Sequence, residues 1–74
     1  MNIIVTPETD SDWSTIQANN LNVGTVVANN KIYMFYPNDA HNNEFSNLEL
    51  AEIRHVGRKT ATALTVTQRL KFKE

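Results

Sequence analysis

The sequence predicts a small α+β domain built on a mainly antiparallel sheet of about four strands. Three observations support this class: β-prone apolar runs alternate with asparagine pairs that suit turns, one segment carries a full helix-start signature, and 74 residues leave room for one domain, 1–74. Because apolar residues fall on both faces of the sheet, a small all-β barrel, SH3-like or OB-like, is the alternative. The predicted strands are 3–5, 23–28, 31–36 and 60–72, and the predicted helices are 47–56 and, shorter, 11–18.

Composition narrows the class of protein. Apolar residues make up 41% of the chain and charged residues 20%, which is typical of a globular protein. The absence of cysteine excludes disulfides, thiolate metal ligands and a cysteine nucleophile. No apolar run approaches the roughly 20 residues of a membrane span, and the first residues lack the basic region of a signal peptide. We therefore expect a cytoplasmic domain with no membrane partner.

The N-terminal part predicts one strand and one short helix. Residues 3–5 form a β-prone run that Pro7 ends. Over 11–18, Trp13 and Ile16 fall at helical spacing behind residues that can cap a helix. Two turns of helix are marginal alone, so we expect Trp13 to anchor them by packing.

The runs 23–28 and 31–36 carry the clearest hairpin signature. They flank the pair Asn29-Asn30, and both of these residues accept the positive φ of a type I′ turn. A two-residue loop fixes the register and places Gly24 opposite Phe35, so that the Phe35 ring can lie over the bare glycine backbone.

Both faces of this hairpin are apolar, which is unusual in so short a chain. Either the pair is central and covered on both sides, or one face is an interface. The second case predicts that a protein partner or a second copy of the chain docks on Tyr33, Phe35 and Val26.

The segment 47–56 has the most complete local signature. Ser46 and Glu49 form a Ser-x-x-Glu capping box, and Gly57 stands where a left-handed residue ends a helix. This pattern predicts a helix over 47–56. A strand that leads into a turn at Gly57-Arg58 is the alternative.

From Thr60 onward the pattern changes to alternation. The run 60–72 is rich in threonine and valine, which favours a strand, and Arg69, Lys71 and Lys73 share one of its faces. That row can contact phosphates, and it equally suits an edge strand whose charges discourage aggregation.

Charge is separated along the chain. Residues 1–49 carry a net charge of −5 and residues 50–74 a net charge of +4. A basic C-terminal part predicts contacts with nucleic-acid phosphates. The predicted contact residues are Arg54, Arg58, Lys59, Arg69, Lys71 and Lys73.

One short stretch is similar to a known motif. Val56-Gly57-Arg58-Lys59-Thr60-Ala61 resembles the second half of the helix-hairpin-helix motif of DNA repair glycosylases, with Arg54-His55 where that family has Pro-Gly. The resemblance covers six residues and implies that backbone amides of the hairpin and of the following helix grip a DNA phosphate.

Catalytic and metal-binding groups are sparse. Asp39, His41 and Glu44 offer oxygen and nitrogen ligands, but such residues are ordinary in a solvated loop, so we expect no metal and no cofactor. The chain has no nucleophile motif, and its two glycines cannot build a phosphate-binding loop. So small a domain also has little room for a pocket, so we expect neither an enzyme nor a small-molecule substrate.

The sequence thus predicts a small non-catalytic binding module whose partner is a nucleic acid, a protein or a second copy of itself. Small chains of this kind are typical of accessory regulators, for instance those of phages and plasmids.

Overall fold

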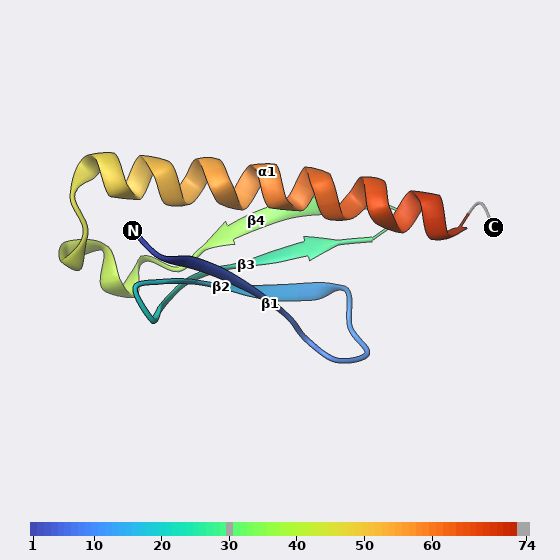
Figure 1. Cartoon of the computed structure of the whole chain (residues 1–74), viewed down its shortest axis with the longest axis horizontal. Helices are drawn as coiled ribbons and strands as arrows, with labels where there is room; N and C mark the ends of the chain where they lie inside the picture. The colour runs from blue at the N-terminus through green and yellow to red at the C-terminus, as the bar shows by residue number, and fades with distance from the viewer. Residues whose placement is uncertain (30, 73–74) are drawn as a thin grey trace.

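The α+β class is confirmed by an open antiparallel sheet followed by a C-terminal helix (Figure 1). The computed structural model describes the backbone of residues 1–29 and 31–72, and the side chains of these residues up to Leu64. The strands follow one another in the sheet in chain order, so β1 and β4 form its two edges and the sheet is not a closed barrel. The elements are β1 (Ile3–Pro7), β2 (Trp13–Ala18), β3 (Leu21–Ala28), β4 (Tyr33–Pro37), the 3₁₀ helix η1 (Asp39–Glu44) and α1 (Asn47–Phe72).

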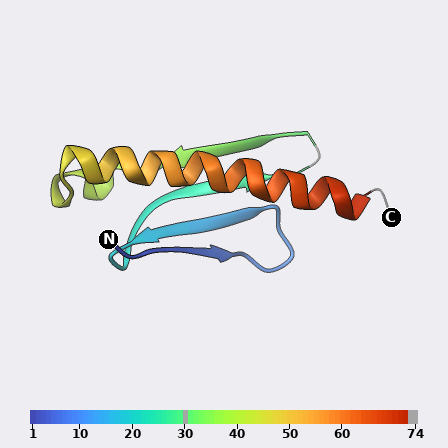
Figure 2. The same cartoon turned by 45° about the horizontal axis from the view of Figure 1, so that its top comes forward.

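The molecule has two layers. Helix α1 runs along one face of the sheet over β3 and β4, and its last turns extend beyond the strands (Figure 2). The apolar core lies between the layers, and at its centre Ile16 and Val26 have no exposed surface. The buried apolar residues are Ile16, Ala18, Val23, Val26, Ala28, Phe35, Phe45, Ile53 and Ala61.

The two glycines of the chain both lie against one aromatic ring, that of Phe35. A Cβ atom on Gly24 of β3 would lie 2.7 Å from Cζ of Phe35, and one on Gly57 of α1 would lie 2.6 Å from its Cγ. Each glycine therefore leaves space that the Phe35 ring occupies. The predicted placement of Phe35 over Gly24 is confirmed, although the register that predicted it differs from the one observed.

The predicted helix over 11–18 is wrong, because these residues contain β2. Ser14, Ile16 and Ala18 are buried and alternate with more exposed neighbours, as in a strand with one covered face. Strand β2 pairs with both β1 and β3, and these two ladders outweigh a two-turn helix that would have stood alone.

The predicted two-residue loop at Asn29-Asn30 is also wrong. Tyr33 pairs with Ala28, so the connection runs over residues 29–32 and β4 begins later than predicted. The side-chain oxygen of Asn29 accepts hydrogen bonds from the backbone N–H groups of Lys31 and Ile32, both at 2.8 Å, and this local bonding favours the longer loop. Because the register moves by two residues, Val26, Tyr33 and Phe35 still share one face, as predicted.

A two-residue turn with positive φ at both positions occurs instead between β2 and β3. Asn19 and Asn20 have φ of 50° and 69°, as a type I′ turn requires. Asparagine thus closes this turn through its backbone, whereas Asn29 acts through its side chain.

The capping box at the start of α1 is confirmed. The Ser46 N–H donates to Glu49 Oε1 at 3.0 Å, and the Glu49 N–H donates to Ser46 Oγ at 3.2 Å. The hydrogen bond from the Ser46 backbone, and then the one with its side chain, holds the pKa of Glu49 below its ordinary value.

The predicted strand over 60–72 is wrong, because α1 continues from Asn47 to Phe72 and does not end at Gly57. Ile53, Gly57 and Ala61 are buried at four-residue spacing and place one stripe of the helix on the sheet. Threonine in a helix can satisfy its hydroxyl internally, and Thr62 Oγ1 donates to the carbonyl of Arg58 at 3.2 Å. Packing of the stripe thus overrides the β-propensity of the sequence.

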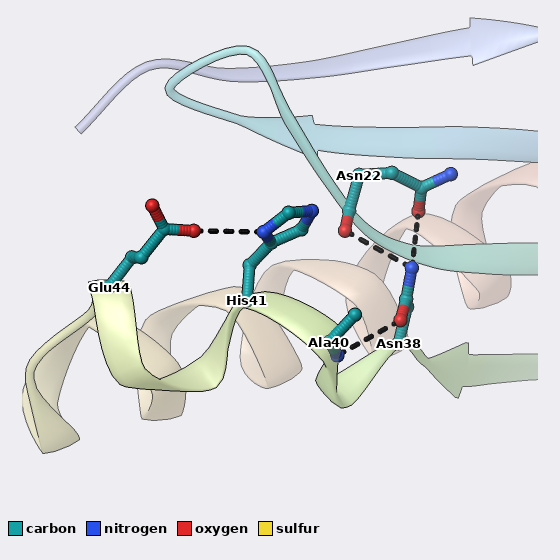
Figure 3. A network of polar contacts seen from close by, with 5 residues as sticks. All are labelled: Asn22, Asn38, Ala40, His41 and Glu44. Carbon is teal, nitrogen blue, oxygen red and sulfur yellow. Dashed lines mark hydrogen bonds and ion pairs between the residues drawn. The ribbon is translucent and has the colours of Figure 1, made fainter.

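Helix η1 connects the sheet to α1 through a polar network (Figure 3). The Asn38 amide donates to the backbone and side-chain oxygens of Asn22 at 3.3 and 3.5 Å, and Asn38 Oδ1 accepts from the Ala40 N–H at 3.1 Å. His41 Nδ1 lies 2.8 Å from Glu44 Oε2. These bonds fix the chain reversal that brings α1 back over the sheet.

Candidate interaction surface

The side of the sheet that faces away from α1, which we call the outer face, is ordered in rows by the strand register. Trp13, Val27 and Met34 align across β2, β3 and β4. The next row crosses all four strands and holds three threonines and Tyr36. The strand positions of the outer face are Ile4, Thr6, Trp13, Thr15, Gln17, Asn22, Thr25, Val27, Met34 and Tyr36.

The outer face exposes large side chains. The exposed fractions of Trp13, Met34 and Tyr36 are 43%, 51% and 48%, and Ile4 is exposed to a similar degree. No element in the described part of the chain lies over them (Figures 1 and 2). A contiguous group of exposed aromatic and methionine side chains is typical of a protein interface.

The outer face is also uncharged. None of its strand positions holds an acidic or basic residue. A charged group borders the face in the loop after β1, where Glu8 Oε1 accepts a hydrogen bond from Thr15 Oγ1 at 3.2 Å. A face with this composition offers no cations to phosphate groups.

The interface residues predicted from the sequence lie mainly on the opposite face. Val26 and Phe35 are buried under α1, and Tyr33 is exposed at the β4 edge. Alternation in the hairpin placed these three residues on one face, as observed. Which face α1 covers depends on the path of the chain after β4, and the strand pattern holds no information on this path.

The predicted basic residues divide into two groups. Arg54, Arg58 and Lys59 lie exposed on α1, and none forms an ion pair among the residues that the structure describes. The side chains of Arg69 and Lys71, and all of Lys73, lie outside the described residues. Because residues 69 and 71 belong to a helix, the strand face that they were predicted to share is wrong.

The resemblance to the helix-hairpin-helix motif has no counterpart in the geometry. Gly57 and the residues after it lie inside α1, and Gly57 does not have the positive φ of a hairpin. Amides in the middle of a helix donate to helix carbonyls, so they have no free donor for a phosphate.

The loop residues whose side chains could offer metal ligands form hydrogen bonds with their neighbours in the loop. His41 pairs with Glu44, and Asp39 Oδ1 accepts from the Asn42 amide at 3.2 Å. Among the described residues, no three histidine, cysteine or acidic side chains gather as metal ligands. Nor does a helix in this part of the chain have the length and apolarity to cross a membrane.

The candidate interaction residues that the sequence did not single out are those of the row Trp13, Val27 and Met34, above all Trp13. The predicted helix placed Trp13 in the core. In a strand, Trp13 shares one face with Thr15 and Gln17 while Ile16 lies on the other, so this alternation could have placed Trp13 outward. Comparison with protein-family models, with curated proteins and with solved structures finds no match.

Proposed function

We propose that the chain is a non-catalytic protein-interaction module that pairs with a second copy of itself through the outer face. The observation that carries this proposal is the exposure of Trp13, Met34 and Tyr36 on one uncovered sheet face. Two sheets that pack face to face, about 10 Å apart, form a common protein core.

The lack of charge favours a second copy as the occupant. Two identical charged faces would repel each other in a two-fold pair. The row of threonines and the row of Trp13, Val27 and Met34 are uncharged, so each can pack against the same face of a second copy. The four strands have five to eight residues each, so the face measures roughly 20 Å by 20 Å at the usual strand spacing and rise. This area is smaller than the roughly 800 Å² that each partner contributes to a standard interface. We therefore expect a reversible dimer with a dissociation constant on the order of micromolar.

Sedimentation over a wide concentration range tests the proposal. The mass should rise from monomer to dimer, and the emission of Trp13, the single tryptophan, should shift to the blue as the dimer forms. Trp13→Ser and Tyr36→Ser should abolish dimerisation. Leu48→Ser is the matched control, because Leu48 is a large apolar residue exposed on α1, away from the outer face.

The proposal is contradicted if the chain sediments as a monomer at every concentration up to about the millimolar range. A dimer that survives both outer-face substitutions would contradict it as well, because its interface would then lie elsewhere.

A second candidate function is nucleic-acid binding by α1. It rests on Arg54, Arg58 and Lys59, three exposed cations within two turns and without ion pairs in the described chain. Binding of mixed DNA and RNA oligonucleotides should weaken steeply as salt rises, since each phosphate contact releases counterions. Absence of binding at low salt, or binding indifferent to salt, would exclude it.

A further inference from the structure

A groove runs between the β4 edge and α1, and Met34 is the residue that it shares with the outer face. It has a volume of about 290 Å³ and is lined by Tyr33, Met34, Phe35, Arg58, Ala61 and Thr62. One wall is therefore a strand at the edge of the sheet, and the other is the helix. A groove of this kind can hold an extended chain beside the strand.

The backbone of β4 presents hydrogen-bonding groups to this groove. The Asn38 N–H donates to the Val23 carbonyl, and the Asn29 N–H donates to the Ile32 carbonyl, at 2.9 and 2.8 Å. In an antiparallel ladder the bonded pairs alternate, so every second residue of β4 directs its N–H and C=O toward β3.

This alternation leaves the backbone groups of Tyr33 and Phe35 directed outward, at the free edge. Both residues occupy the non-bonded positions of the ladder, opposite Ala28 and Val26. Pro37, the last residue of β4, has no N–H to offer, so the usable edge is short. An added strand would pair over about five residues.

The helix wall adds a positive charge. Arg58 lines the groove, and Arg54 lies one turn before it on α1. Neither forms an ion pair in the described chain, and residues 53–64 of α1 include no acid. The planar guanidinium of arginine binds a carboxylate through two parallel hydrogen bonds.

We propose that the groove binds an extended segment of a partner protein that carries an acidic side chain. The segment adds a fifth strand to the sheet at β4, through the N–H and C=O groups of Tyr33 and Phe35, and its carboxylate binds Arg58. Tyr33 and Met34, both about half exposed, cover the apolar side chains of the segment. A nucleic acid has no amide ladder with which to use the strand edge, so an acidic peptide fits the groove better.

The probe is an acetylated and amidated peptide of about seven residues, with alternating valine and threonine and one central glutamate. A second peptide carries lysine in place of that glutamate. Titration of the ¹⁵N-labelled chain should shift the amides of β4 and of α1 around Arg58. We expect the glutamate peptide to bind about tenfold more tightly than the lysine peptide.

Two pairs of variants separate the contributions. Tyr33→Pro removes both the side chain and the outward N–H, whereas Tyr33→Ala removes the side chain and keeps the N–H. Only Tyr33→Pro should therefore lose the backbone pairing and abolish binding. Arg58→Glu should reverse the preference toward the lysine peptide. Lys59→Glu makes the same change of charge outside the groove and should leave the preference for glutamate in place. The charge reversal stands as a test even if Tyr33→Pro does not fold.

Three results would overturn the proposal: equal affinity for the two peptides, equal affinity of Tyr33→Pro and Tyr33→Ala, or shifts confined to the outer face. An oligonucleotide is the competing ligand. If it displaces the peptide, and if Arg58→Glu and Lys59→Glu weaken its binding equally, the cations bind nucleic acid instead. The inference does not depend on dimerisation, because the monomeric Trp13→Ser variant should bind the glutamate peptide as the unaltered chain does.

Discussion

The two faces of the sheet are built from alternate residues of the same strands, yet they differ in almost every other respect. On the inner face, Gly24, Phe35 and Gly57 interlock so tightly that neither glycine has space for a methyl group. On the outer face, Trp13 and Tyr36 remain nearly half exposed. Both faces therefore carry large apolar side chains, but only those of the inner face are buried in the monomer.

This difference shows which apolar side chains the fold leaves exposed and therefore available to a partner. A side chain that is already buried contributes to folding, whereas one that stays exposed can contribute only when something covers it. The outer face keeps apolar side chains that the monomer does not use, which is the reason for assigning the interface to it.

The largest expected effect contrasts neighbouring residues of β4. Phe35→Ala should lower the free energy of unfolding by about 3–5 kcal/mol, because it empties the space between the two glycines. Tyr36→Ala, one residue later and on the outer face, should lower it by less than about 1 kcal/mol. Urea denaturation at low protein concentration measures both. Similar losses for the two variants would remove the distinction between the faces.

The next effect concerns a glycine in a helix. Gly57→Ala would stabilise an exposed helix by about 1 kcal/mol, but here the new methyl group would meet the Phe35 ring. We expect a net destabilisation of about 1–3 kcal/mol. A smaller side chain at position 35 should relieve the clash, so Gly57→Ala should cost less in a Phe35→Leu background than alone. Additive effects of the two substitutions would show that the ring and the glycine do not interact.

The same residues show how much of the fold can be predicted from the sequence. The pairing of an aromatic ring with Gly24 and the helix start at Ser46 and Glu49 are local patterns, and both are predictable. Where a helix or strand ends is not predictable from the sequence when packing decides it. Residues 60–72 favour a strand by composition. The structure shows instead that α1 continues through them, with Ile53 and Ala61 buried against the sheet and Leu64 partly buried.

The candidate interaction surface was also predictable in part, because alternation along a strand is a local pattern. Alternation along 23–36 identifies two apolar faces, so an uncovered apolar face was one of the two possibilities that the strands predicted. The choice between them required the path of α1. The groove could not be predicted at all, since it joins Tyr33 with Arg58, which become neighbours only when the helix returns over β4.

A smaller effect tests the helix cap. Ser46→Ala removes the oxygen that accepts the Glu49 N–H, and it should cost about 1 kcal/mol. Because the cap supports the layer that covers the inner face, dimerisation through the outer face should not change. Denaturation and sedimentation of the same variant check the two statements. A change in dimer affinity would mean that the faces are coupled.

The smallest effect is a pH dependence. The pKa of Glu49 is lowered in the folded chain, so its contribution to stability is complete above its ordinary pKa of 4.5 and is lost as pH falls through the lowered value. Glu49→Gln should remove this part of the acid destabilisation. The difference in unfolding free energy between the two proteins should therefore shrink on acidification below about pH 4.5. A difference that stays constant with pH would show that the charge of Glu49 has no role.

The order of the elements has a consequence for the nascent chain. Each strand pairs only with its neighbour in sequence, so the sheet can form as soon as β4 has been synthesised. Its cover, α1, emerges last. Until then both faces of the sheet are bare, and the edge of β4 lacks the helix beside it. A chain cut after Pro37 would retain that state, and we expect it to aggregate as it leaves the ribosome.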